Sequence, residues 1–106
     1  MYPTSDRRIK PRINCDYPAI IEGIDVDGNK FNDHGRLSNL SASGLFMFAN
    51  RRIEYGSKLS VTIILSNSPE DMDAPKLATN GTVVRIESQV NETRSIAIKF
   101  NKYKFL

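Results

Sequence analysis

The chain has 106 residues, of which 40% are hydrophobic and 25% are charged, as in one small folded domain. No stretch approaches the ~20 apolar residues of a membrane-spanning helix, and we expect no secretory signal because the first residues lack an apolar segment. The single cysteine, Cys15, cannot form an internal disulfide, and we interpret it as a small structural residue. These features predict a cytoplasmic protein.

The net charge of +3 comes from one short segment. The first twelve residues hold four basic side chains, Arg7, Arg8, Lys10 and Arg12, against one acidic side chain, Asp6. The remaining 11 basic and 11 acidic residues cancel. A solvated basic tail and an anion-binding arm are both compatible with this pattern.

In chain order, residues 1–14 hold two prolines among polar neighbours and predict an extended arm rather than a strand or helix. Residues 17–26 are rich in Ile and Val, and Asp27-Gly28-Asn29 after them predicts a hairpin. We expect the returning strand, which holds Phe31 and Leu37, to be interrupted by the polar residues 32–35. The apolar run 45–48 predicts another strand.

The second half of the chain alternates more clearly. Leu59, Val61 and Ile63 alternate with smaller or polar residues, which predicts a strand over 59–65 with one buried face. A loop over 66–76 and a strand over 77–87 follow, with Gly81 as a bulge or point of close approach. Residues 90–92 predict a turn, and 95–100 predict a last strand. About six short strands and no long helix indicate a small barrel or sandwich.

The sequence contains no recognisable catalytic or metal-binding arrangement. We interpret the only histidine, His34, as a surface residue in a polar loop. No Cys/His cluster has zinc spacing, and the acidic residues 70–73 lack the spacing of a calcium loop. We therefore expect a protein that is not an enzyme and has no cofactor or metal.

Two short segments have side chains suited to ligand binding. Arg8 and Arg12 lie four residues apart with a proline between them, and their guanidinium groups can grip phosphates or a guanine edge. Asn39 and Ser41 lie two residues apart and face the same side of an extended chain, and Gly44 leaves room for a flat ligand near the backbone. A polar turn between two strands would also explain the second segment.

Together, in this order and spacing, the two segments resemble the PilZ domain family. That family is marked by R-x-x-x-R and, about 20 to 30 residues later, by [D/N]-x-S-x-x-G. The resemblance extends over residues 7–101, through the predicted strands at 45–48, 59–65, 81–85 and 96–100. It implies a six-stranded antiparallel β-barrel over residues 15–106, preceded by a flexible basic arm over residues 1–14.

The resemblance also implies a function, which is binding of the bacterial second messenger cyclic di-GMP as a sensor domain. Arg8 and Arg12 would grip guanine and phosphate groups, and Asn39 and Ser41 would hydrogen-bond the guanine edge or nearby ligand groups. Gly44 would let the ligand approach closely. Two more candidates lie outside the strict motif, namely Arg7, which is adjacent to it, and Arg85, whose guanidinium plane can stack on a base.

Two alternatives to nucleotide sensing stay open. One is an interaction module of the same fold that binds proteins and binds nucleotide weakly or not at all. The other is a barrel that binds RNA or single strands, which would interleave basic and aromatic residues on a strand face. Phe46 and Phe48 alternate, but we interpret them as core residues because Leu45 and Met47 flank them. We therefore expect cyclic di-GMP and a downstream protein or fused effector domain as partners, no DNA binding and no membrane insertion.

Overall fold

The computed structural model describes residues 13–14, 16–66, 73–88 and 94–106, and all the regular structure among them is β-strand. The strands are β1 (Ile13–Asn14), β2 (Pro18–Ile24), β3 (Lys30–Leu40), β4 (Gly44–Ala49), β5 (Lys58–Ile64), β6 (Lys76–Ser88) and β7 (Arg94–Phe105). The predicted strands are confirmed to within two residues at most boundaries. The exceptions are β3, which is continuous, and β7, which is five residues longer at its C-terminal end.

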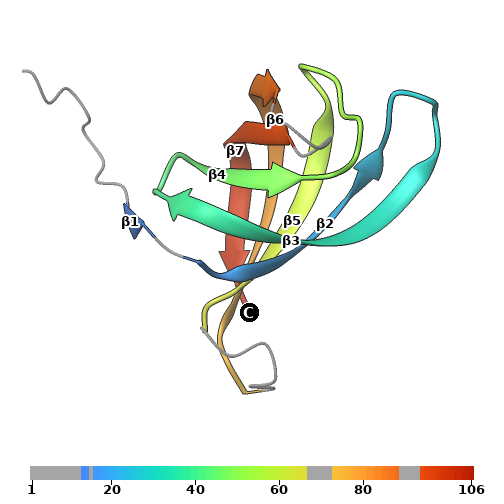
Figure 1. Cartoon of the computed structure of the whole chain (residues 1–106). Helices are drawn as coiled ribbons and strands as arrows, with labels where there is room; N and C mark the ends of the chain where they lie inside the picture. The colour runs from blue at the N-terminus through green and yellow to red at the C-terminus, as the bar shows by residue number, and fades with distance from the viewer. Residues whose placement is uncertain (1–12, 15, 67–72, 89–93) are drawn as a thin grey trace, which may run out of the picture.

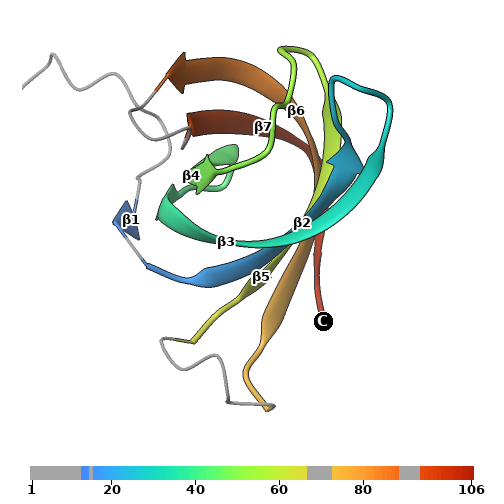
Figure 2. The same ribbon diagram turned by 45° about the vertical axis from the view of Figure 1, so that its right-hand side comes forward.

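Strands β2 to β7 close into an antiparallel barrel (Figures 1 and 2). The hydrogen-bonded order is β3-β2-β5-β6-β7-β4, and β4 pairs back to β3, so the ring has no open gap in the strand order. This confirms the predicted six-stranded antiparallel β-barrel. The two-residue strand β1 lies outside the ring and pairs only with the end of β3. Residues 13–14 are therefore a strand, where the sequence had predicted only an extended arm.

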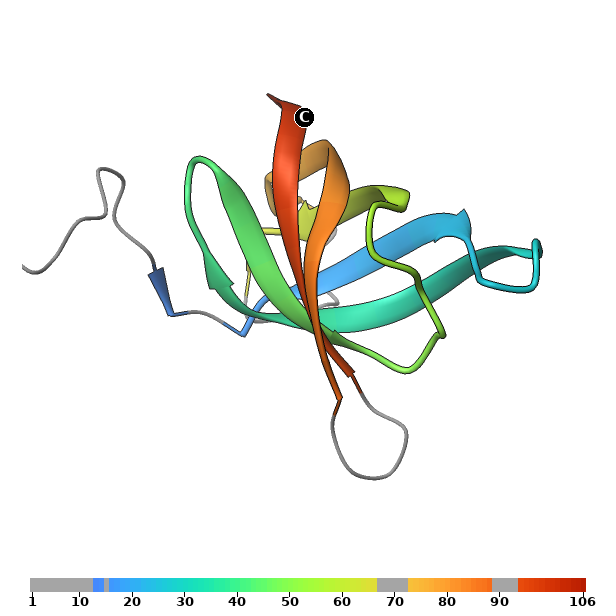
Figure 3. The same cartoon turned by 90° about the horizontal axis from the view of Figure 1, so that it is seen from above.

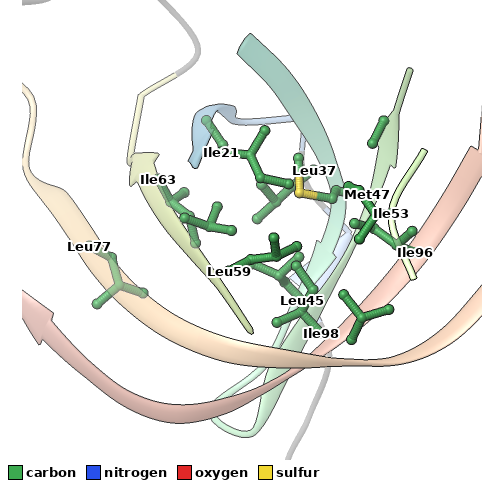
Figure 4. Packing of buried hydrophobic residues seen from close by; sticks show 14 of the residues in the cluster. Ile21, Leu37, Leu45, Met47, Ile53, Leu59, Ile63, Leu77, Ile96 and Ile98 are labelled. Carbon is green, nitrogen blue, oxygen red and sulfur yellow. The ribbon is translucent and has the colours of Figure 1, made fainter. Parts of the chain in front are cut away.

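Alternating side chains from every strand of the barrel fill its core (Figure 4). In β5, Leu59, Val61 and Ile63 are all buried while the residues between them are exposed or half-buried, as the alternation predicted. Each such aliphatic side chain contributes about 1.5–3 kcal/mol by leaving water. The other buried hydrophobic residues of this cluster are Ala19, Ile21, Phe31, Leu37, Leu45, Met47, Ala49, Ile53, Leu77, Val83, Ile96 and Ile98.

The prediction of an interruption at residues 32–35 was wrong, because β3 runs through them without a break. His34 pairs with Ile20 and Gly35 with Ala19, so His34 is an exposed strand residue and not a loop residue. The backbone of this polar stretch is paired along β2, and its neighbours Phe31 and Leu37 supply the buried face. Strand formation here depends on pairing and on neighbouring burial more than on the local hydrophobicity.

The predicted hairpin between β2 and β3 is confirmed, and Asp25 organises it. The Asp25 carboxylate accepts hydrogen bonds from the backbone N–H groups of Asp27 and Asn29, each at 3.0 Å, and Gly28 adopts a left-handed conformation with φ of 83°. Figure 3 shows this hairpin projecting to the right of the barrel, next to the chain that connects β4 to β5. Val26 N–H donates to the Arg52 carbonyl at 3.1 Å and joins the two segments.

The β6–β7 ribbon contains two irregularities of pairing. The first lies opposite Gly81, where Asn101 of β7 has no partner of its own, and a Cβ atom on Gly81 would collide with the Ile98 side chain and the Lys99 carbonyl. The predicted close approach at Gly81 is confirmed, and the bulge lies opposite it, with Asn101 of β7 as the extra residue. The second is at Val84, which is left without a partner between the pairs Val83–Ile98 and Arg85–Ala97.

Candidate functional site

The turn between β3 and β4 carries the second sequence motif, and Ser41 holds this turn together. Its backbone N–H donates to the Gly44 carbonyl at 2.9 Å, and its hydroxyl lies 3.1 Å from the Ser43 hydroxyl. The Ser43 N–H also donates to the Ser41 hydroxyl oxygen at 3.3 Å. Asn39 is the penultimate residue of β3 and pairs with Phe46, so it lies on the strand before the turn. Asn39 and Ser41 are both half-buried.

Gly44 is required by the neighbouring strand. A Cβ atom at Gly44 would overlap the carbonyl oxygen of Ile98 and contact the Lys99 backbone, because β4 and β7 approach closely there. The space beside Gly44 that we expected a ligand to approach is therefore filled on this side by the backbone of β7. Gly44 has a structural reason to be glycine that does not depend on any ligand.

A hollow of about 310 Å³ lies beside this turn, between β4, β7 and β6. It brings together three of the predicted site residues, Asn39, Gly44 and Arg85, although they come from three different strands. The other lining residues are Ser43, Leu45, Phe46, Val84, Ala97, Ile98 and Lys99. Arg85 and Lys99 are its charged residues and no acidic residue lines it. Arg85 Nε lies 3.5 Å from the exposed Glu87 carboxylate, and an exposed ion pair of this kind is weak, so the hollow still favours an anion.

Arg85 faces this hollow because of the bulge at Val84. In an unbroken ladder, Val84 would pair with Ala97 and face outward, and Arg85 would turn toward the buried Ile96. Leaving Val84 as an extra residue pairs Arg85 with Ala97 instead, on the outer face. The same Ala97 pairs with Phe46 on the other side, so a small residue separates Arg85 from Phe46 across β7.

The Arg85 guanidinium lies over the Phe46 ring, and both residues line the hollow. The guanidinium carbon of Arg85 lies 5.6 Å from the centroid of the Phe46 ring, and Phe48 packs edge-on against Phe46 at 6.4 Å. The interpretation of Phe46 and Phe48 as core residues was wrong. Leu45 and Met47 fill the core, while Phe46 is half-buried on the outer face and Phe48 is exposed. Pairing with β7 decides which residues face outward, since Phe46 lies opposite Ala97 and Met47 opposite the buried Ile96.

A larger hollow of about 830 Å³ lies at the other end of β3 and β4, and its charged lining residues are three aspartates and three arginines, namely Asp25, Asp27, Asp33, Arg51, Arg52 and Arg94. Much of its charge is already paired. Arg51 donates to both carboxylate oxygens of Asp33, at 2.9 and 2.8 Å, and lies 3.7 Å from Asp25. The hydrogen bond from Arg51 lowers the pKa of Asp33, and the same bond raises the pKa of Arg51. Its three aspartates make this hollow less suited to an anion than the smaller one.

The remaining predicted site residues, Arg7, Arg8 and Arg12, lie outside the described residues, as does Cys15. The nearest described part of the chain is β1, in which Ile13 pairs with Leu40 and Asn14 pairs with Asn39. Within the described ranges, no group of three or more His, Cys, Asp or Glu residues could hold a metal ion. No helix in that part of the chain is long and apolar enough to cross a membrane.

The fold is a small closed antiparallel barrel with a hollow beside its β3–β4 turn. The family model of the PilZ domain matches residues 6–104, and the chain belongs to the PilZ domain family. This confirms the family that the two motifs indicated. No curated protein matches the sequence.

Three solved structures share the fold at low sequence identity. The inhibitor of motility MotI/DgrA of Bacillus subtilis is 20% identical with a TM-score of 0.70, over 98% of this chain and 49% of that chain. The PilZ domain of Escherichia coli YcgR with c-di-GMP is 15% identical with a TM-score of 0.60, over 92% of this chain and 79% of that one. Escherichia coli YcgR in complex with c-di-GMP is 16% identical with a TM-score of 0.58, over 89% and 38%. The chain thus spans about half of MotI/DgrA.

Proposed function

We propose that this domain binds cyclic di-GMP and acts as a sensor, without catalysis. The observation that carries the proposal is the hollow beside the β3–β4 turn, which gathers Asn39, Gly44 and Arg85 and contains no acidic residue. Membership of the PilZ family supports the ligand class, as do the two YcgR structures that contain c-di-GMP. A cytoplasmic location belongs to the same proposal, because the ligand is a bacterial second messenger.

The charge and shape of the ligand suit this hollow. Cyclic di-GMP carries two phosphate charges and two flat guanine bases, each with O6 and N7 acceptors. The Asn39 side chain offers a donor and an acceptor for a guanine edge. The surface formed by Arg85 and Phe46 is suited to stacking against a base, and such stacking contributes about 1–3 kcal/mol per base.

In this proposal the arginines of the first motif complete the site. Arg12 is two residues before Asn14, which pairs with Asn39, so chain connectivity alone keeps the two Cα atoms of Arg12 and Asn14 within about 7 Å. Arg12 is therefore within reach of the Asn39 end of the hollow. An arginine paired bidentately with guanine O6 and N7 is worth about 1–3 kcal/mol of discrimination. Arg8 and Arg7 would add contacts to phosphate or to the second base.

We further propose that ligand binding orders the segment 1–12 against the barrel, to which residues 13–14 are joined by their pairing with β3. Fixing a backbone residue costs about 1–2 kcal/mol, which several charge-assisted hydrogen bonds of about 1.5–3 kcal/mol each would offset. Amides of residues 7–12 should exchange quickly in the free protein and slowly with cyclic di-GMP, while β5 changes little. Protection of residues 7–12 without ligand would contradict the ordering, although binding itself would survive.

Isothermal titration calorimetry with cyclic di-GMP, cyclic di-AMP and GTP tests the proposed function. We expect cyclic di-GMP to bind at least tenfold more tightly than the other two, because adenine presents an N6 donor where guanine presents O6. Arg8→Ala and Arg12→Ala should each weaken binding strongly, and the double variant should give almost no heat. Arg52→Ala is the matched control, since this exposed arginine lines the other hollow.

The outcome of this titration separates the candidate functions. Equal affinity for cyclic di-AMP would remove the guanine-specific part of the proposal. No heat with cyclic di-GMP, from a protein that melts cooperatively, would overturn nucleotide sensing and favour the protein-interaction module. Both the nucleotide sensor and the protein-interaction module would act on a downstream protein or a fused effector domain.

A further inference from the structure

The last residues of β7 form a strand edge that no described strand covers. Strand β4 pairs with residues 94–99 of β7, and its first residue, Gly44, lies opposite Lys99. Strand β6 pairs with β7 beyond this point, as far as Phe105. Figures 1 and 2 show this part of β7 running past β4 to the C-terminus. Leu106 N–H donates to the Lys76 carbonyl at 2.8 Å, toward β6, so by alternation the backbone groups of Tyr103 and Phe105 point to the open edge.

This edge has a different chemical character on each of its two faces. Tyr103 and Phe105 lie opposite the buried residues Thr79 and Leu77, so their rings extend the core face, where they stay 50% and 66% exposed. The rings form a row with Phe100, with centroid distances of 5.8 and 6.5 Å. Lys102 and Lys104 lie opposite Asn80 and Ala78 on the outer face of the barrel, and both lysines are exposed. One face of the edge is therefore aromatic and the other is cationic.

We propose that the open edge of β7 over residues 101–105 adds a strand from a partner protein, a segment with alternating acidic and apolar residues. An added strand would satisfy the open backbone groups of Tyr103 and Phe105. Its apolar side chains would lie beside the two rings, and its carboxylates would lie beside Lys102 and Lys104, since neighbouring strands place opposite residues on the same face. This surface is separate from the nucleotide hollow, and its proposal does not depend on the proposed function.

Repulsion between lysines disfavours pairing of this edge with the same strand of a second copy of the protein. In any antiparallel register that overlaps residues 102–104 and keeps the rings on one face, a lysine lies directly opposite a lysine. A single-stranded nucleic acid is also disfavoured. Stacked bases and phosphates would need aromatic and basic side chains on one face, and here they lie on opposite faces.

Two-dimensional NMR of the 106-residue protein without nucleotide tests the proposal. The probe is a blocked seven-residue peptide of alternating Glu and Val. We expect the amide signals of Tyr103 and Phe105 to shift most and to exchange more slowly with solvent. A peptide N-methylated at alternate residues, on the edge that would face β7, should bind at least tenfold more weakly because its donors are removed.

Charge reversal supplies the matched variants. The double variant Lys102→Glu and Lys104→Glu should lose at least tenfold in affinity for the Glu–Val peptide and gain affinity for a Lys–Val peptide. Lys30→Glu with Lys58→Glu, a pair of exposed lysines on β3 and β5, should bind as the unchanged protein does. Shifts confined to other strands, or equal binding of the N-methylated peptide, would overturn the proposal. Preferential binding of a ten-residue oligothymidylate at these amides would also overturn it.

Discussion

Replacing Gly44 by alanine tests whether this glycine serves the fold. The added Cβ atom would overlap the Ile98 carbonyl oxygen, which belongs to the backbone of β7 and cannot move like the end of a flexible side chain. Strands β4 and β7 are paired at this point through Gly44 and Lys99, so separating them disturbs the ladder. The Ser43 carbonyl, which accepts a hydrogen bond from Phe100 N–H at 2.9 Å, adjoins the same position.

The size of the effect follows from these contacts. Overpacking in a well-packed region costs about 1–3 kcal/mol, and the loss of one hydrogen bond costs about 0.5–1.5 kcal/mol. We therefore expect Gly44→Ala to lower the free energy of unfolding by about 2–4 kcal/mol. In a domain of this size, each kcal/mol lowers Tm by about 4–8 °C.

Thermal melting followed by circular dichroism, without any nucleotide, is the assay. Gly28→Asn is the control, because a Cβ atom added at Gly28 would meet no atom within 4 Å and asparagine tolerates its left-handed conformation. The control should melt close to the unchanged protein. If Gly44→Ala melted within 2 °C of the unchanged protein (roughly the effect of 0.3–0.5 kcal/mol), the steric argument would be refuted. Loss of cyclic di-GMP binding by such a stable variant would assign the glycine to the ligand.

Three more outcomes follow from other contacts. Met47→Ala, which empties a fully buried position, should lower the unfolding free energy measured in urea by about 2–5 kcal/mol. Phe46→Ala should weaken cyclic di-GMP binding in calorimetry by about 1–3 kcal/mol while barely changing Tm, and the reverse pattern would make Phe46 structural. Because Arg51 lowers the pKa of Asp33, the stability advantage of the unchanged protein over Asp33→Asn should be complete above the ordinary carboxyl pKa near 3.8 and disappear as pH falls through the lower folded-state pKa. Urea titrations at pH 6 and pH 3 measure it, and a constant difference would contradict the pairing.

The sequence predicts the strands whose two faces differ in polarity. In β5 the buried residues alternate with smaller polar ones, and the structure confirms that pattern. The polar half of β3 could not be predicted in this way, because its side chains at 32 and 34 face solvent and its strand state comes from pairing with β2. The last residues of β7 were missed for the same reason, since β6 pairs with them and their side chains are exposed.

The site was only partly predictable because it depends on register. The run from Leu45 to Phe48 is apolar on both faces, so the sequence does not say which pair faces inward. Pairing with β7 decides it, since Met47 lies opposite the buried Ile96 and Phe46 lies opposite Ala97. The position of Arg85 depends likewise on the bulge at Val84, which two adjacent valines do not reveal.

The two bulges of the β6–β7 ribbon have a consequence for changes in chain length. Removing Val84 would leave Val83 opposite Ile98 and Arg85 opposite Ala97, with no side chain changing face. Removing Asn101 would do the same on the other strand, at the loss of its 3.0 Å hydrogen bond to the Thr82 hydroxyl. Elsewhere in the ribbon, a one-residue deletion puts inward and outward side chains out of phase. Residues 84 and 101 are therefore the points at which this part of the barrel can shorten by one residue while its core and its outer surface keep their composition.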